Sequence, residues 1–231
     1  MKMNRILAIA EKDFKEFMRN MMLLTMPLLP IILAAMYSNM PFDEMEGGRE
    51  FIAIILMGMA LGAVLTSAMM TMLAEENEKH TLRGLINSPA TMIDILVGKS
   101  LVVTVMMILS VIISLINIKV NIFTDYKMVL GFIGLYLFFL FLGIGVGLIV
   151  RSVSETSLYL LPILFVFAMS PMFRIFLGIE SSFLKVMKYL PLSQYMELAE
   201  NGGWMPVIII FIWSLLAFLV MALLFRKVRT D

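Results

Sequence analysis

Apolar residues fill six long stretches of the chain, and short polar intervals separate them. Most of these stretches reach the ~20 residues that an α-helix needs to cross about 30 Å of hydrocarbon. The pattern predicts six transmembrane helices, at residues 21–38, 51–74, 100–118, 128–150, 158–177 and 204–225. We therefore expect an all-α integral membrane protein with one domain over residues 1–231.

Two prolines, Pro27 and Pro30, interrupt the first apolar stretch. Proline has no backbone N–H and disturbs the hydrogen bonds of a helix interior. A kink or a partial unwinding is expected here. Neighbouring helices would have to satisfy the carbonyl groups that it frees.

Residues 4–20 form an amphipathic segment ahead of the first stretch, with apolar side chains on one face and charges on the rest. A helix of this kind lies in the plane of the lipid headgroups, with its apolar face in the hydrocarbon. The alternative is a plain extension of the first span into the cytoplasm. The residues expected at the membrane surface are Phe14 and Phe17, in lipid, and Lys12, Lys15 and Arg19, among the headgroups.

The longest polar interval is residues 75–99, which also holds the single histidine, His80. Charged side chains cost about 2.5–3.5 kcal/mol each at the middle of a bilayer, so this interval must lie outside the hydrocarbon. Leu82 and Leu85 recur at helical spacing, and Ser88-Pro89 ends the helix. The pattern predicts a short helix, a kink and a second helix that continues into the third span, which together suit a docking element.

Lysine and arginine placement predicts the orientation, because cytoplasmic segments are enriched in both. With the N-terminus inside, the inner segments hold twelve of the 18 basic residues, against six outside. Residues 75–99 and both termini are therefore expected in the cytoplasm. The twelve are Lys2, Arg5, Lys12, Lys15, Arg19, Lys79, Arg83, Lys99, Arg151, Arg226, Lys227 and Arg229.

The outer interval before the last span, residues 178–203, is long and amphipathic, and Pro191 divides it. It is too charged and too broken for a seventh span. We expect a re-entrant or interfacial segment at the outer leaflet.

Two pairs of glycines stand four residues apart within the spans. This spacing places both glycines of a pair on one helix face and allows two helices to approach closely. We interpret them as packing positions inside the bundle: Gly58 and Gly62, and Gly143 and Gly147.

Composition and the scarcity of reactive groups limit the possible chemistry. The chain is 61% hydrophobic and 15% charged, with a net charge of +1 and no cysteine, so neither nucleic-acid binding nor a resident metal is expected. One histidine cannot supply a zinc site or a catalytic triad. Gly98-Lys99-Ser100 resembles the end of a phosphate-binding loop, but Ile93 stands where its first glycine would be. We expect no catalytic residue and no cofactor in this chain.

The spans are nearly free of ionisable residues, whereas ion-coupled carriers usually place Asp, Glu or His on the ion pathway. Arg174 lies near the outer end of the fifth span, where it can reach the interface. This argues against secondary transport driven by the chain itself, whereas facilitation of a substrate without ion coupling stays open. Energy for active transport is expected to come from elsewhere.

The docking element, E-x-E-K-H-T-L-R-G-L-I-N-S-P followed by G-K, resembles the cytoplasmic signature of ABC-2 type transporter permeases. The layout of the whole chain is also similar to that family. His80 stands where a glycine is frequent, and Arg83 where Glu or Gln often occurs. The matching positions are Glu76, Glu78, Lys79, Thr81, Leu82, Leu85, Ser88, Pro89, Gly98 and Lys99.

The resemblance implies a membrane subunit that pairs with a second permease, a copy or a paralogue, and with two ABC ATPase subunits that bind ATP and Mg. The inner helix would be a coupling helix seated in a groove of the ATPase, with Ser88 and Pro89 setting its kink. The N-terminal helix would be a second contact, and the pieces around Pro191 would shape the exit. The expected docking residues are Glu76, Glu78, Thr81, Leu82, Arg83 and Leu85.

The function expected from this resemblance is ATP-driven export, or extraction from the bilayer, of an apolar, amphipathic or peptide-like substrate. The family also suggests the plasma membrane of a bacterium or archaeon. Two alternatives stay open: an immunity or lipid-handling permease of the same family, and a scaffold that recruits a cytoplasmic enzyme without transport.

Overall fold

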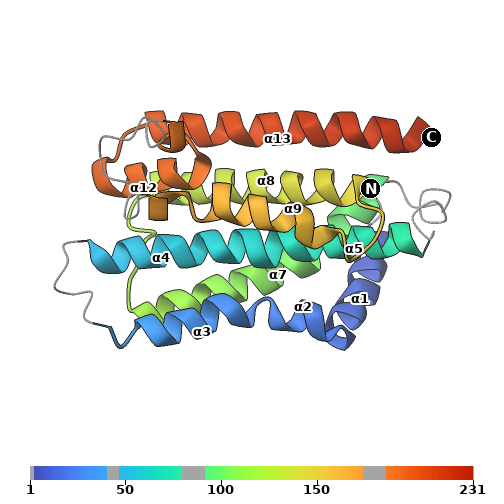
Figure 1. Cartoon of the computed structure of the whole chain (residues 1–231), viewed down its shortest axis with the longest axis horizontal. Helices are drawn as coiled ribbons and strands as arrows, with labels where there is room; N and C mark the ends of the chain where they lie inside the picture. The colour runs from blue at the N-terminus through green and yellow to red at the C-terminus, as the bar shows by residue number, and fades with distance from the viewer. Residues whose placement is uncertain (1–2, 41–46, 80–91, 174–185, 231) are drawn as a thin grey trace.

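A computed structural model describes residues 3–40, 47–79, 92–173 and 186–230, and every regular element within them is helical (Figure 1). The helices are α1 (Met3–Arg19), α2 (Met21–Thr25), α3 (Leu28–Tyr37), α4 (Gly48–Met59), α5 (Ser67–Glu78), α7 (Met92–Ile118), α8 (Tyr126–Ile149), α9 (Thr156–Ile163), α12 (Pro191–Asn201) and α13 (Met205–Thr230). Two π-helical segments, η2 (Ala60–Thr66) and η3 (Leu164–Ala168), and one 3₁₀ turn, η4 (Ser170–Met172), complete the order.

Four described helices are long and apolar enough to cross a membrane: Gly48–Glu78, Asp94–Ile118, Tyr126–Ile149 and Met205–Arg226. A fifth candidate is the pair Ile6–Arg19 and Met21–Tyr37, which bends by 83°. The six-span layout is not confirmed, because the predicted fifth span is a helix only over Thr156–Ala168. Pro171 follows that helix in η4, and residues 174–185 lie outside the described part.

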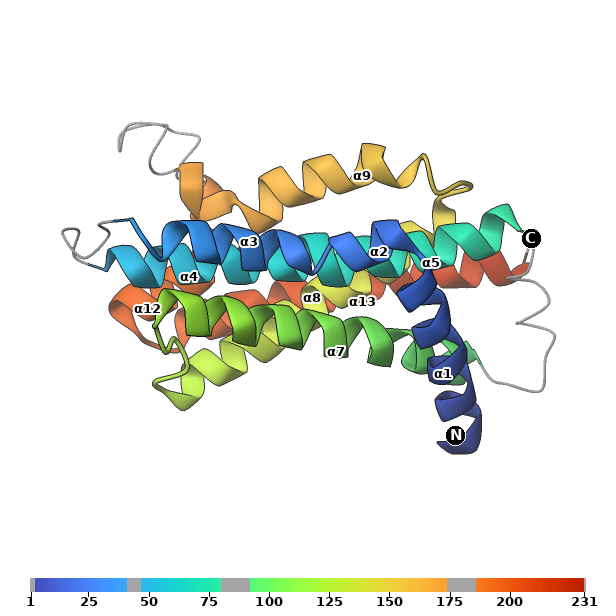
Figure 2. The same cartoon turned by 90° about the horizontal axis from the view of Figure 1, so that it is seen from below.

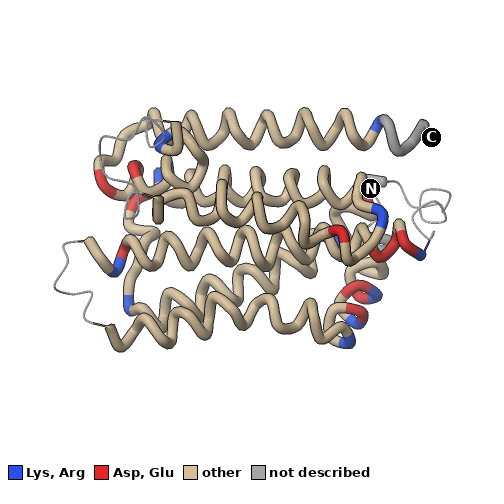
Figure 3. Tube along the Cα trace, in the orientation of Figure 1, with Lys and Arg blue, Asp and Glu red and all other residues tan. Residues whose placement is uncertain are grey.

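The long helices run side by side, while α1 crosses one end of the bundle almost at right angles to α2 and α3 (Figure 2). We call this end, where α5 finishes and α7 begins, the α1 end; the opposite end, with α12, is the α12 end. Charged residues gather at the two ends and leave an uncharged band between them (Figure 3). This distribution fits a multi-pass membrane protein.

The first apolar stretch is broken at Met26-Pro27, as the prolines predict, and divides into α2 and α3. The Ser110 hydroxyl of α7 donates a hydrogen bond of 2.9 Å to the Pro27 carbonyl. The predicted break is confirmed. The carbonyls that Pro27 and Pro30 leave without a helical partner belong to Leu23 and Met26, and the Leu29 N–H donates to the Met26 carbonyl at 3.3 Å within the same segment. Satisfaction of these carbonyls by a neighbouring helix stays a prediction.

The second stretch passes through the π-helical segment η2 before it continues as α5. The Thr66 hydroxyl lies 3.1 Å from the Leu61 carbonyl and 2.9 Å from the Phe139 carbonyl of α8. Thr66 therefore satisfies backbone oxygens that a π-helical turn and a close helix contact bring together.

Glycines let α8 approach the second stretch closely. A Cβ atom on Gly143 would lie 2.9 Å from the Thr66 carbonyl oxygen, and one on Gly147 would lie 3.0 Å from Leu73. On the second stretch, Gly58 faces Leu192 of α12, and Gly62 faces the η3 segment. All four glycines therefore lie at crowded helix contacts.

The α12 helix begins at Pro191, whose missing N–H costs little in a first helical turn. It lies within residues 178–203, where we expect a re-entrant or interfacial segment. The helix packs against α4, α8 and α13, and Leu192 and Tyr195 are fully buried. Gly58 and Gly131 leave the space that these two side chains occupy.

Two glycines on α8 provide a matched test of this packing. Gly143→Ala should destabilise the fold by about 1–3 kcal/mol, because its methyl group meets backbone atoms of Thr66. Gly145→Ala should change the stability little, because its methyl group has ordinary contacts from 3.5 Å. Thermal unfolding of the purified variants in detergent compares them, and equal melting temperatures would contradict the packing.

Candidate functional site

A buried cluster of charges joins three helices at the α1 end. The Lys99 ammonium of α7 lies 2.8 Å from Glu76 Oε1 of α5, and 3.3 Å from both carboxylate oxygens of Asp13 on α1. The side chains of Lys99, Asp13 and Glu76 are 1%, 0% and 6% exposed. Lysine is almost never buried to this degree unless it is paired.

Lys12 completes the cluster from the solvent side. Its ammonium lies 3.8 Å from Asp13 Oδ1 and 3.7 Å from Glu76 Oε1, and its side chain is 52% exposed. Two lysines therefore face two carboxylates, so the four formal charges cancel. A neutral cluster is far cheaper to bury than any one of its members alone.

Gly98 explains how α1 comes within reach of Lys99. A Cβ atom at Gly98 would lie 2.8 Å from the Ile9 side chain and 3.2 Å from the Ile6 carbonyl oxygen. Only a residue without a side chain lets α1 cross α7 at this distance. The next residue, Lys99, then extends under α1 to meet Asp13.

On α1, Asp13 shares the buried face with Ile6 and Phe17, at the seven- and four-residue spacings of a helix stripe. Burial raises the pKa of Asp13 above its usual value, because it disfavours the charged form. The positive charges of Lys99 and Lys12 oppose this shift.

The end of α5 is also tied to the end of α8. The Asn77 side-chain amide donates to the carbonyls of Gly147 and Val150, at 3.2 and 2.9 Å. The Val153 N–H donates to Glu78 Oε2 at 2.9 Å. Three successive residues of α5 therefore connect it to α1, α7, α8 and the turn after α8.

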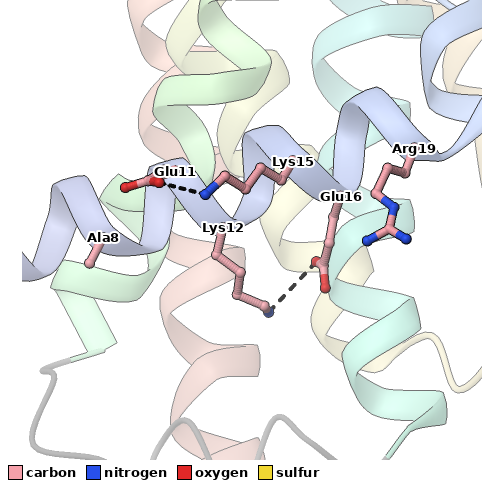
Figure 4. A pocket seen from close by; sticks show the side chains of 6 residues that line it. All are labelled: Ala8, Glu11, Lys12, Lys15, Glu16 and Arg19. Atoms are coloured by element: carbon pink, nitrogen blue, oxygen red, sulfur yellow. Dashed lines mark hydrogen bonds and ion pairs between the residues drawn. The ribbon is translucent and has the colours of Figure 1, made fainter.

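The outward face of α1 carries paired charges (Figure 4). Lys15 contacts Glu11 at 2.6 Å, which lowers the pKa of that carboxyl group, and Lys12 lies 3.6 Å from Glu16. Arg19 lies on the same face, near the start of α2 (Figure 4). This face lines a shallow depression that is open to solvent.

The structure places the predicted surface residues of α1 on both sides of the helix. Phe14 is 45% exposed, but Phe17 is fully buried. The prediction that Phe17 faces lipid is therefore wrong, because α1 turns this side toward α2 and the bundle core.

The predicted docking residues fall into two groups. Glu76 is buried in the charge cluster, and Glu78 binds the turn after α8, so both are engaged within this chain. The remaining residues lie outside the described part of the structure, and their docking role stays a prediction. They are Thr81, Leu82, Arg83, Leu85, Ser88 and Pro89.

Sequence reasoning missed the roles of Asp13 and Lys99. The sequence pattern places the charges of residues 4–20 away from the apolar face of the helix, and it places Lys99 in the polar interval 75–99, outside the hydrocarbon. The signal for Asp13 was its spacing, seven residues after Ile6 and four before Phe17, which puts an acid on an apolar stripe. For Lys99, the preceding glycine indicated a helix crossing.

The charged groups of the cluster are engaged with one another. Among the described residues, no group of three or more His, Cys, Asp or Glu side chains could hold a metal ion. The cluster instead fixes α1 to the two helices that flank residues 79–91.

No protein-family model matches the sequence, and a comparison with curated proteins finds no match.

Removal of the central lysine tests the cluster. Lys99→Met leaves Asp13 and Glu76 buried without their nearest cation, and should cost about 3–5 kcal/mol of stability. Lys15→Met should have little effect, because Lys15 and Glu11 are exposed. Unfolding in detergent measures both variants.

A neutral triple variant separates charge from packing. Lys99→Met combined with Asp13→Asn and Glu76→Gln should recover part of the stability that Lys99→Met loses, since no uncompensated charge then stays buried. A triple variant less stable than Lys99→Met alone would contradict an electrostatic origin.

Proposed function

We propose that this chain is the membrane subunit of an ATP-driven ABC exporter and has no ATPase site of its own. The observation that carries the proposal is the Glu76–Lys99 pair, which joins the two helices on either side of residues 79–91 and ties both to α1 through Asp13. The same segment carries the signature that resembles ABC-2 permeases. A partner that moves this segment would therefore move α1, α5 and α7 as one rigid unit.

Rigid attachment matters because an ATPase can do work on a membrane domain only through elements that do not yield. The α5 end is held to α1 and α7 by charge, and to α8 by Asn77 and Glu78. Force applied between α5 and α7 would therefore reach most of the α1 end. Rigid-body movement of this kind is a common route for switching.

Backbone irregularities in three neighbouring segments supply places where such movement could be absorbed. The Ser67 hydroxyl, directly after η2, lies 3.3 Å from the Met26 sulfur, beside the α2–α3 break. On another side, Gly62 of η2 faces Leu164 and Ala168 of η3. By contrast, α7, α8 and α13 run without interruption. Irregular segments (η2, η3 and the α2–α3 break) beside continuous helices favour a tilt of one part of the bundle against the other.

The charge pattern supports an orientation with the α1 end in the cytoplasm. The proposed location is the plasma membrane of a bacterium or archaeon, with both termini inside. The proposed partners are two ABC ATPase subunits, which bind ATP and Mg, and a second permease copy or paralogue. The proposed substrate is apolar, amphipathic or peptide-like.

Affinity purification with cross-linking tests the partnership. We expect an ABC ATPase to co-purify with the chain in stoichiometric amount, with ATP hydrolysis that vanadate inhibits. Leu82→Glu with Arg83→Glu should reduce its recovery at least tenfold, because both changes fall in the proposed docking helix. Mass spectrometry of the purified complex gives the ratio.

Lys127→Glu is the matched control, because it also reverses a charge but lies at the α12 end, beside Trp204. It should leave ATPase recovery unchanged. ATPase binding without any substrate-dependent hydrolysis would favour a recruiting scaffold over a transporter, and the absence of an ATPase would contradict the proposal.

The absence of cysteine from the sequence allows a clean test of orientation. Lys15→Cys at the α1 end should be protected from a membrane-impermeant maleimide in intact cells and should react after lysis. Lys127→Cys at the α12 end should react in intact cells. The reverse pattern would place the α1 end outside and would rule out ATPase docking there.

A further inference from the structure

A groove between α8 and α13 has no role in the coupling described above. It encloses a volume of about 150 Å³, and Phe167 of η3 closes one side of it. Phe138, Phe167 and Trp213 form a mutual edge-to-face cluster at this side, with ring centroids 5.2–6.0 Å apart. The groove follows α13 from Trp213 to Leu224, a rise of roughly 16 Å along a helix.

The chemistry of the lining excludes a polar occupant. Every side chain that lines the groove is apolar or is Trp213, and the Trp213 indole N–H already donates to the Tyr189 carbonyl at 2.8 Å. A peptide or sugar would lose its hydrogen bonds to water here and gain none. A hydrocarbon chain loses nothing, and apolar cavities of this size bind small hydrocarbons.

The groove also opens where hydrocarbon is available. It lies between α8 and α13, which are long and apolar enough to cross a membrane and whose middle parts carry no charged residue (Figure 3). At its rim, Leu216 and Val220 are 48% and 56% exposed. Gly145 and Ala217 also line the groove, and because their side chains are absent or small, they leave space in it for an occupant.

The end of the groove indicates which lipid would be favoured. Leu224 lies half a turn before the exposed Arg226, and the sequence continues as Lys227-Val228-Arg229. No acidic residue occurs in α13. A chain that lies in the groove would therefore place its headgroup beside a basic segment, which attracts anionic lipids.

We propose that this groove binds one acyl chain of an anionic phospholipid, with the headgroup at Arg226. The site goes beyond the proposed export function and does not depend on an ATPase. It depends only on the placement of α8 and α13 across a membrane.

The two tryptophans allow a direct measurement. Trp204 lies at the α12 end, against Tyr126, so Trp204→Phe leaves Trp213 in the groove as the single reporter. The variant is reconstituted in phosphatidylcholine vesicles with rising fractions of brominated phosphatidylglycerol or brominated phosphatidylcholine. Bromine quenches tryptophan on contact, so the fraction at half-quenching reports occupancy of the groove.

We expect brominated phosphatidylglycerol to reach half-quenching at about a fivefold lower fraction than brominated phosphatidylcholine, the preference that one basic residue near the surface provides. In the Arg226→Gln variant, the two brominated lipids should reach half-quenching at the same fraction. In a Trp213→Phe variant, the remaining Trp204 should show no such preference, which separates the groove from bulk lipid.

Filling the groove is the decisive control. Gly145→Leu should abolish the preference, because its side chain occupies the groove, whereas Gly145→Ala should retain it. Circular dichroism and the melting temperature establish that Gly145→Leu is folded, and Val220→Phe fills the same groove from its rim if it is not.

Equal quenching by both lipids, or a preference that survives the filled groove, would overturn the proposal. Protection of Trp213 from both brominated lipids would also overturn it, because it would show that a protein surface, such as a second copy of the chain, covers the groove.

Discussion

The architecture of the α1 end follows from the cost of burying one ammonium group. Lys99 can be 1% exposed only because carboxylates from two other helices meet it. Satisfying it requires α1 to cross α7 at Gly98 and requires α5 to end beside both. The 83° bend after α1 and the close packing around Phe17 are consistent with this one electrostatic requirement.

Two different kinds of interaction hold the two parts of the bundle. At the α1 end, charges and side-chain amides fix helix termini to one another. Within the uncharged band, contact depends on shape: glycines admit neighbouring backbones, and two hydroxyl groups donate to backbone carbonyls of neighbouring helices, Ser110 to that of Pro27 and Thr66 to that of Phe139. Shape-based contacts tolerate sliding better than paired charges do, so the stiff part of the molecule and its more adaptable part occupy different depths.

Sequence patterns predicted most of the helices and the break at Pro27, because hydropathy and proline act locally. The predicted fifth span is not confirmed, because its helix covers Thr156–Ala168, a 3₁₀ turn follows, and residues 174–177 lie outside the described part. Apolar composition alone does not show where a helix ends. Sequence patterns also placed Asp13 with the other charges of α1, away from its apolar face, because its partner lies 86 residues away and no local pattern reveals such a pairing. The burial of α12 likewise depends on the space that Gly58 and Gly131 leave on other helices.

The same separation of 86 residues bears on how the chain is made. Synthesis proceeds at about 5–20 residues per second, so roughly 4–17 s pass between the addition of Asp13 and that of Lys99. During that interval α1 has an acid on its apolar face and no cation from α7 to receive it. The first helix of the chain therefore reaches its final position only after the third apolar stretch has begun to emerge, and its docking marks the completion of the N-terminal half.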